Sequence, residues 1–406
     1  MSSTLSGADQ PLADLYDVAL LDLDGVVYVG TDAVPTAPAA LAAVRERGVR
    51  LAFVTNNAAR SPLAVAEHLT ELGVAATAAE VVTSAQAAAR YLADRLPGGS
   101  RVLVIGTTGL HEALEERGLG WTSEDSDDVA AVVQGYSPET NWKLLAEGAV
   151  AINRGVLWVA TNADPTVPSA RGPLPGNGSL VAALRTATRR EPVVTGKPDP
   201  TMHRETVIRT KAERPLVVGD RLDTDIEGAT AVGCPSLLVF SGVTTPVELL
   251  AASQSLRPTY VAADLTGLLV GHPEPRLSGR GASCGQWAVT VDGDELVLET
   301  DARSRQAGGR GRLTEPGKDS RRPTPSVPPS AAGGGVVGHG AAEVDPARTP
   351  REAGYDDDVL DAVRALCAAQ WNRGGSGEGL AGVRASEGDQ RAARMVTRLG
   401  LSTKPQ

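Results

Sequence analysis

Two acidic residues, Asp22 and Asp24, stand at the end of a short apolar run, Val18–Leu21, with only Leu23 between them. Side chains two positions apart in an extended segment point to the same side, so both carboxylates can face one crevice. Gly25 permits a tight turn directly after the pair. Open α/β sheets bind ligands at the carboxyl ends of their strands, although these two acids alone are equally consistent with a strand end that merely meets solvent.

Three later apolar runs also end in polar or charged groups. These groups are Thr55, Asn56 and Asn57 after LAFV, Lys197 in PVVTGKP, and Asp220, Asp223 and Asp225 in PLVVGDRLDTDI. Each has an ordinary structural alternative, such as a helix N-cap, a surface lysine or an acid that complements a helix dipole. Four aliphatic runs that end in complementary groups together predict a magnesium-dependent phosphoryl-transfer site.

The chemistry of phosphoryl transfer requires such a set. Two carboxylates from different strand ends, Asp22 and Asp220, can give Mg²⁺ the hard oxygen ligands that it prefers. One carboxylate can attack phosphorus and form an aspartyl-phosphate, while a second acid protonates the leaving alkoxide and then activates water. Lys197, the Thr55 hydroxyl and main-chain N–H groups near Asn56 can neutralise the charge of the transferring group.

The elements that position these groups alternate between aliphatic runs and helical patterns. Residues 15–85 and 190–271 share this pattern, which is typical of βαβ units and a parallel sheet. Residues 86–189 carry a second alternating set that is long enough for a separate unit. We therefore expect an α/β protein with a Rossmann-like parallel-sheet core, formed by the two outer segments, and an inserted α/β domain.

The last third of the chain has a different composition. Residues 272–301 include GQWAVTVDGDELVLE, which predicts a hairpin about an Asp-Gly turn. Residues 302–353 are rich in Gly, Pro, Arg and Ser and read as a disordered linker. Residues 354–406 contain two stretches that predict short helices, which alone bury little. We expect a poorly ordered C-terminal extension.

The motifs DLDGV, VTNN, GKP and GDRLDTDI, in this order, resemble the four motifs of the haloacid dehalogenase superfamily over residues 15–271. The resemblance implies that Asp22 is the nucleophile and Asp24 the acid/base. It also implies that Mg²⁺ is held by Asp22, by the main-chain carbonyl of Asp24 and by Asp220. The remaining matches are Thr55 and Lys197 as phosphate-binding groups, and Asp225 and Asp223 as acids that orient metal-bound water.

The inserted domain falls between the second and third motifs, which resembles the type IIA cap of the nitrophenylphosphatase and phosphoglycolate phosphatase branch. Within it, the greatest likeness is to bacterial glycerol 3-phosphate phosphatases, which also have a C-terminal extension. We therefore expect hydrolysis of glycerol 3-phosphate, with phosphoglycolate, 4-nitrophenyl phosphate or a sugar phosphate as alternatives. Phosphotransfer to another acceptor and a non-catalytic phosphometabolite sensor with a partner-binding tail stay open. In the cap, Asn162, Asp164 and Arg171 are candidate substrate contacts.

Composition excludes several classes of partner. The formal net charge is −10, which disfavours general binding to nucleic acid or to an anionic membrane. No apolar run is long enough to span a bilayer, and the three cysteines, Cys234, Cys284 and Cys367, are far apart. We expect a cytoplasmic protein that acts on a small phosphorylated metabolite. The resemblance adds a possible cap-mediated homodimer.

Overall fold

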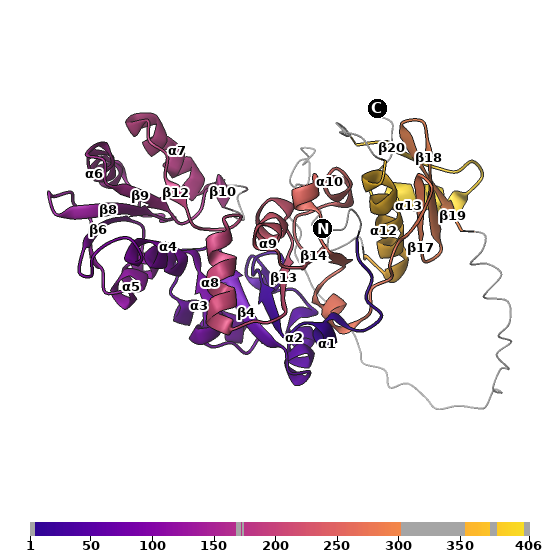
Figure 1. Ribbon diagram of the computed structural model, residues 1–406, viewed down its shortest axis with the longest axis horizontal. Helices are drawn as coiled ribbons and strands as arrows, with labels where there is room; N and C mark the ends of the chain where they lie inside the picture. The colour runs from indigo at the N-terminus through magenta and orange to yellow at the C-terminus, as the bar shows by residue number, and fades with distance from the viewer. Residues whose placement is uncertain (1–4, 168–171, 173, 302–353, 374–379, 402–406) are drawn as a thin grey trace, which may run out of the picture.

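A computed structural model describes residues 5–167, 172, 174–301, 354–373 and 380–401. Its centre is a six-stranded parallel sheet (Figure 1). The strand order is β15 (Tyr260–Ala262), β14 (Ser236–Val239), β13 (Pro215–Gly219), β1 (Val18–Leu21), β4 (Arg50–Thr55) and β5 (Val81–Thr83). The central strand β1 is buried throughout and pairs with β13 and β4, as the aliphatic run predicts. The predicted parallel-sheet core is confirmed.

Helices cover both faces of this sheet because alternate strand residues point to opposite sides. Ala19 and Leu21 pack with α2 (Ala37–Glu46) and α3 (Pro62–Glu71). Val18 and Leu20 face α4 (Ser84–Ala93), α8 (Pro200–Thr210) and α9 (Glu227–Val232). Shorter elements complete this part of the chain, namely α1 (Leu12–Leu15), β2 (Tyr28–Val29), β3 (Asp32–Ala33) and α10 (Pro246–Leu250).

The segment between α4 and α8 forms a second parallel sheet, which we call the cap. Its strand order is β12 (Val193–Val194), β9 (Leu157–Ala160), β8 (Val129–Gln134), β6 (Arg101–Ile105) and β7 (Gly120–Thr122). Three longer helices belong to it, α5 (Thr108–Glu116), α6 (Trp142–Asn153) and α7 (Asn177–Thr188), together with the pair β10 (Thr166–Val167) and β11 (Leu174–Pro175). It has its own sheet, and one apolar cluster lies wholly within it while a second also includes Ala58 and one face of α4, so the predicted inserted α/β domain is confirmed.

One strand end differs from the expectation. The run before Lys197 was expected to return the chain to the core from residue 190, yet Val193 and Val194 pair with β9 of the cap sheet. A two-residue apolar run fits either parallel sheet equally well, so its sequence carries no sign of which sheet it joins. Lys197 therefore approaches the core from the last cap strand, and the chain returns to the core with α8.

The C-terminal extension contains regular structure in its described parts. Strands β16 (Arg276–Ser278), β17 (Gly281–Cys284), β18 (Trp287–Asp292), β19 (Glu295–Thr300) and β20 (Gly382–Ala385) form a five-stranded sheet. Strands β18 and β19 make the hairpin at Asp292–Glu295, and α12 (Asp357–Trp371) and α13 (Gln390–Arg398) occupy the two helical stretches. The expected linker at 302–353 lies outside the described residues. None of the described helices has the length and apolar character needed to cross a membrane.

The sequence predicts that the helices of residues 354–406 bury little surface, and helix α12 differs most from this expectation. Most of its 15 residues are buried, and they share one apolar cluster with core residues such as Leu238 and Val261. The buried guanidinium of Arg364 donates a hydrogen bond to the main-chain oxygen of Val261 at 3.0 Å. The helix lies between the core and the extension sheet, so both of its sides are covered (Figure 1). A helix with partners on two sides buries more than a single amphipathic face would.

Candidate active site

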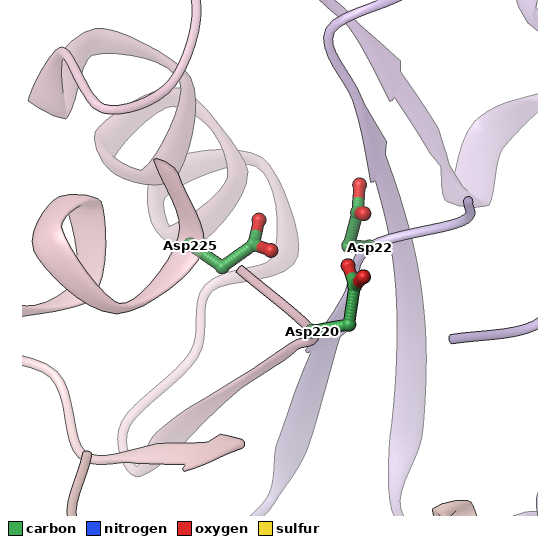
Figure 2. A group of neighbouring side chains, drawn as sticks. All are labelled: Asp22, Asp220 and Asp225. Atoms are coloured by element: carbon green, nitrogen blue, oxygen red, sulfur yellow. The ribbon is translucent and has the colours of Figure 1, made fainter. Parts of the chain in front are cut away.

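Three carboxylates gather at the carboxyl ends of neighbouring core strands. Asp22 follows β1, Asp220 follows β13, and Asp225 lies in a helical turn, η2 (Leu222–Ile226), directly before α9. Each offers one oxygen, and these oxygens all lie within 4.8 Å of one another. Figure 2 shows the Asp225 carboxylate directed toward the other two. Adjacent parallel strands end at the same sheet edge, which is why acids far apart in sequence meet here.

Lys197 joins two of these acids. Its Nζ lies 2.5 Å from Asp22 Oδ1 and 2.7 Å from Asp225 Oδ1, and it also donates to the main-chain oxygen of Val54 at 3.3 Å. Burial lowers the pKa of the Lys197 ammonium, but the charges of Asp22 and Asp225 outweigh burial and raise this pKa. The lysine is therefore held in its charged form beside Asp22.

Asp220 has an unused oxygen. Its Oδ2 accepts a hydrogen bond from the Val243 N–H at 2.8 Å, whereas the buried Oδ1 has no hydrogen-bond partner among the described residues. Burial, followed by the charge of Asp225, raises the pKa of Asp220 to about 7. Burial also raises the pKa of Asp22, against the opposing charge of Lys197. Three acids that share one lysine are short of positive charge, so their hard oxygens fit a divalent cation such as Mg²⁺.

Two glycines let Asp220 approach this closely. Gly25 has a φ of +84°, and a Cβ at this position would collide with the Asp220 carboxylate. A Cβ at Gly242, in the loop after β14, would collide with the same carboxylate. The loop is also tied to the first motif, because the Ser241 hydroxyl donates to the Gly25 main-chain oxygen at 2.7 Å. Both positions therefore need a residue without a side chain.

Asp24 differs from the other acids in its exposure. Residue Asp24 keeps a solvent-accessible surface, while the intervening Leu23 is buried in the core. Nearby protein atoms still displace part of the water around the Asp24 carboxyl and raise its pKa, and the positive charges of Lys197 and Arg60 oppose this rise only in part. A carboxyl that is accessible and holds its proton to a higher pH is suited to give that proton to a leaving group.

The three polar residues of the second motif, Thr55, Asn56 and Asn57, make different contacts. Thr55 is buried at the end of β4, and its hydroxyl accepts a hydrogen bond from the Asn57 N–H at 3.1 Å. The exposed Asn57 uses its Oδ1 to accept the Ala59 N–H at 2.8 Å, so its side chain serves the local turn. The Asn56 side chain contacts the main chain of Lys197 and the cap residue Asp164.

Two further expectations have different outcomes. The exposed Asp223 pairs with Arg221 at 3.0 Å, and it is outside the cluster of carboxylates. Asp164 contacts Asn56, Asn162 contacts the Asn56 main chain, and Arg171 lies outside the described residues. Sequence reasoning missed the loop that holds Asp220, at Ser241–Val243. The run SLLVF before it is a further strand end, and the same rule of strand ends would have found it.

A lysine paired with buried carboxylates at the strand ends of a parallel sheet, beside an inserted cap, defines a phosphoryl-transfer hydrolase. Comparison with known proteins gives the same class. A haloacid dehalogenase-like hydrolase model matches residues 19–120, and a HAD-hydrolase-like model matches residues 194–268. The D-glycerol 3-phosphate phosphatase of Mycobacterium tuberculosis is 48% identical over 287 residues, which cover 71% of this chain and 79% of the relative. The chain belongs to the haloacid dehalogenase-like hydrolase family and is a phosphatase.

Solved structures share the fold. The glycerol phosphate phosphatase from Mycobacterium tuberculosis in complex with magnesium has a TM-score of 0.76 and 38% identity, and the match covers 97% of this chain and 99% of that chain. The p-nitrophenyl phosphatase from Archaeoglobus fulgidus has a TM-score of 0.59 and 31% identity, with 63% and 98% covered. The first match includes the C-terminal extension, whereas the second covers little more than the length of the core and cap.

Proposed function

We propose that the chain is a Mg²⁺-dependent phosphomonoesterase that hydrolyses a small organic phosphate through an aspartyl-phosphate on Asp22. Glycerol 3-phosphate is the leading candidate substrate. The observation that supports this reaction most is the Lys197 ammonium between Asp22 and Asp225, at 2.5 and 2.7 Å, beside the buried Asp220. This arrangement provides a carboxylate nucleophile and a fixed positive charge in one place, as displacement at phosphorus requires.

In the first displacement an oxygen of Asp22 attacks phosphorus, and the bond from phosphorus to the ester oxygen breaks. Asp24 gives its proton to this oxygen, so the alcohol leaves in neutral form. Lys197, whose Nζ contacts Asp22, and the Thr55 hydroxyl at the end of β4 would bind oxygens of the transferring group. The product of this step is the alcohol and an acyl phosphate on Asp22.

In the second displacement Asp24, now ionised, removes a proton from a water molecule. The water oxygen attacks phosphorus, the bond to Asp22 breaks, and inorganic phosphate leaves. Both carboxyl groups then regain their original protonation states, so one substrate and one water are consumed in each cycle. The raised pKa of Asp24 favours the protonated form that the first displacement needs.

Asp22, Asp220 and the main-chain carbonyl of Asp24 would hold the Mg²⁺ ion. The unpartnered Asp220 Oδ1 and the excess of buried acids support this assignment, as does the neighbouring structure in complex with magnesium. When bound, the ion neutralises phosphate charge and orients the phosphoryl group for in-line attack. Asp225, with its Lys197 contact, fixes the lysine from the opposite side.

Glycerol 3-phosphate is proposed from the 48% identical relative that is named for this substrate. The half-buried carboxylate of Asp164, which accepts from Asn56 at 3.2 Å, adds negative charge beside the site. That charge disfavours a leaving group with its own carboxylate, such as glycolate from phosphoglycolate. A 5′-nucleotidase of Bacillus subtilis, 36% identical over 253 residues, and acid sugar phosphatases of Staphylococcus indicate the alternatives.

We propose that the reaction takes place in the cytoplasm, and the three unpaired cysteines support this proposal. A cap-mediated homodimer stays a prediction. A phosphometabolite sensor is less consistent with the site, since a protein that only binds phosphate has no use for a nucleophile and an accessible acid. Turnover separates the sensor from the enzyme.

The test is phosphate release from a panel of glycerol 3-phosphate, phosphoglycolate, a nucleoside monophosphate, a hexose phosphate and 4-nitrophenyl phosphate, with Mg²⁺ or EDTA. Asp22→Asn is expected to lower kcat by about 10⁴-fold or more, because the amide is not a nucleophile. Asp127→Asn, an exposed change in the cap, is the matched control and keeps normal turnover. Undiminished turnover in Asp22→Asn would exclude Asp22 as the nucleophile.

A further inference from the structure

The side chain of Asn56 binds both main-chain polar groups of Lys197. Its Oδ1 accepts the Lys197 N–H at 2.8 Å, and its Nδ2 donates to the Lys197 carbonyl oxygen at 3.1 Å. The two bonds fix the orientation of the amide, because only an oxygen can accept from the N–H group. A planar amide that meets one residue at two points restrains both its position and its rotation.

The main chain of Lys197 needs such a restraint because of the way it enters the site. Lys197 follows the last cap strand, β12, which pairs with β9 of the cap, and the next core element, α8, begins only at Pro200. Asn56, by contrast, directly follows Thr55 at the end of core strand β4. The contact between Asn56 and Lys197 therefore ties the catalytic lysine to the core sheet.

The approach is too close for a side chain at Gly196. A Cβ at this position would lie 2.8 Å from Asn56 Oδ1 and would collide with the main-chain oxygen of Thr161. The segment that carries Lys197 is thus pressed between the end of β4 and the end of cap strand β9. Small shifts of either element would move the lysine.

Asn56 also contacts the cap. Its Nδ2 donates to Asp164 Oδ2 at 3.2 Å, and its main-chain oxygen accepts from Asn162 Nδ2 at 2.8 Å. The hydroxyl of Ser84, at the start of α4, donates to the same main-chain oxygen at 2.6 Å. Asn177 in turn donates to the Asn162 main-chain oxygen at 2.7 Å. One residue therefore joins a core strand, the catalytic lysine and the cap segment 162–164.

We propose that Asn56 is a positioning residue, whose side chain holds Lys197 Nζ against Asp22 and Asp225 and links that placement to the docked cap. The inference rests on the proposed phosphatase reaction and gives the Asn56 side chain its own role, beside the phosphate binding expected of main-chain N–H groups near Asn56. All the polar atoms of that side chain are engaged by Lys197 and Asp164, so none is left for substrate. The cap contact makes the lysine best placed when the cap is seated.

The test compares Asn56→Ala and Asn56→Asp with the unchanged chain, using hydrolysis of 4-nitrophenyl phosphate with Mg²⁺. Loss of the restraint is expected to lower kcat by about 10–100-fold, the cost of misplacing a catalytic group by roughly 1 Å. KM is expected to change by less than about threefold, because the substrate contacts remain. The aspartate keeps the acceptor for the Lys197 N–H but places a carboxylate against the Lys197 carbonyl and Asp164, so it does not restore kcat.

A double-mutant cycle with Lys197→Met shows whether Asn56 acts through the lysine. In the Lys197→Met background, Asn56→Ala is expected to lower kcat by less than about threefold, since the group that it positions is absent. Asn141→Ala removes the side-chain cap of α6 on the cap surface and serves as the matched control with normal kcat. Thermal unfolding of every variant shows that it is folded before its kinetics are compared.

An equal loss from Asn56→Ala in both backgrounds would overturn the inference, as would an Asn56→Ala variant with normal kcat. A rise in KM with unchanged kcat would instead assign the side chain to substrate binding and would also overturn it. These outcomes differ from failure of the proposed function, in which the unchanged chain itself releases no phosphate from any monoester in the panel.

Discussion

The cap and the C-terminal extension are joined to the core to different extents. Among the described residues, one apolar cluster lies wholly within the cap, and a second is shared with Ala58 and one face of the core helix α4. Polar contacts add to this boundary, with the Thr107 hydroxyl on the Ala59 oxygen at 2.8 Å and Arg117 on Glu205 at 3.2 Å. The cap therefore meets the core through one shared apolar cluster, hydrogen bonds and an ion pair.

The extension, in contrast, continues the core. One cluster contains Leu238, Phe240 and Val261 of the core together with Trp287 of the extension sheet and Leu366 of α12. Burial of such side chains contributes about 25 cal/mol per Å² of apolar area, so this boundary is far more stable than one made of exposed ion pairs. The inserted cap therefore shares a smaller part of its apolar packing with the core than the C-terminal extension does.

Removal of the extension is expected to destabilise the protein more than any other change considered below. A chain that ends at residue 271 would expose Leu238, Phe240, Leu249 and Val261, which share an apolar cluster with the extension. We expect loss of the cooperative unfolding transition and aggregation on expression, measured by calorimetry and by the soluble fraction. A soluble chain with the unfolding temperature of the full protein would contradict the shared cluster.

A point substitution in the extension and a deletion of the cap are to be compared with the truncation. Leu366→Ala in α12 leaves the chain complete and is expected to lower the free energy of unfolding by about 2–5 kcal/mol. Replacement of residues 98–192 by a short Gly-Ser linker removes most of the cap and its own clusters. This control is expected to lose turnover but to keep more of the core's stability than the truncation does, because it uncovers mainly small side chains such as Ala85, Ala88 and Ala89.

The next largest effect on stability is expected from the hydrogen bonds of Asp389 within the extension. Asp389 caps α13 and accepts from the Thr300 N–H at 2.8 Å. Burial acts to raise the pKa of Asp389, but the Thr300 hydroxyl and the main-chain N–H groups outweigh it and lower the pKa to about 2. A lowered pKa means stability that is present above the ordinary pKa, near 4, and that is lost as the pH falls toward 2. Asp389→Ala is therefore expected to cost about 0.5–2 kcal/mol at neutral pH.

Urea unfolding at several pH values measures this dependence. The difference between the unchanged chain and Asp389→Ala should stay constant above pH 5 or so and shrink as the pH is lowered below about 4. A difference that grows on acidification would show that Asp389 is not stabilised as a carboxylate.

The smallest effect is expected at the polar boundary of the cap. Arg117→Ala removes one of the two arginines that pair with the largely buried Glu205, and Arg90, at 3.3 Å, remains. The free energy of unfolding should fall by about 0–1 kcal/mol, because a partly exposed ion pair contributes little. The change should be visible instead in kcat/KM for a small substrate, measured beside Arg101→Ala, a surface pair within the cap. A loss of several kcal/mol would show that the cap is built into the core as firmly as the extension.

The site could be predicted from sequence where a simple geometric rule applies. Asp22 and Asp220 end adjacent parallel strands, and such strand ends meet at one edge whatever the rest of the chain does. Lys197 was predicted to join them, yet the strand before it belongs to the cap sheet, and two valines carry no information about their sheet. Asp223 and Asp225 are two aspartates of the same short segment, so the sequence does not distinguish their roles. The turn of the backbone directs Asp225 inward and Asp223 to Arg221.

The extension could be predicted only in its local structure. The Asp-Gly turn and the Ala-rich stretches indicate a hairpin and helices, which the structure shows at β18–β19, α12 and α13. The partners of α12 are core strands and an extension sheet from distant parts of the chain. Because small apolar residues such as Ala362 and Ala369 pack against many surfaces, the helix sequence does not specify that both of its sides are buried.

The position of β1 has a consequence for the order of events during synthesis. Val18 pairs with Arg50 on one side and with Pro215 on the other, so the whole cap is translated between the two neighbours of the central strand. At about 5–20 residues per second, the ribosome needs roughly 8–33 s to supply the second neighbour. Throughout that interval the emerging chain has an open sheet edge beside Asp22. If the cap folds during synthesis, less of the chain remains unfolded until β13 is made.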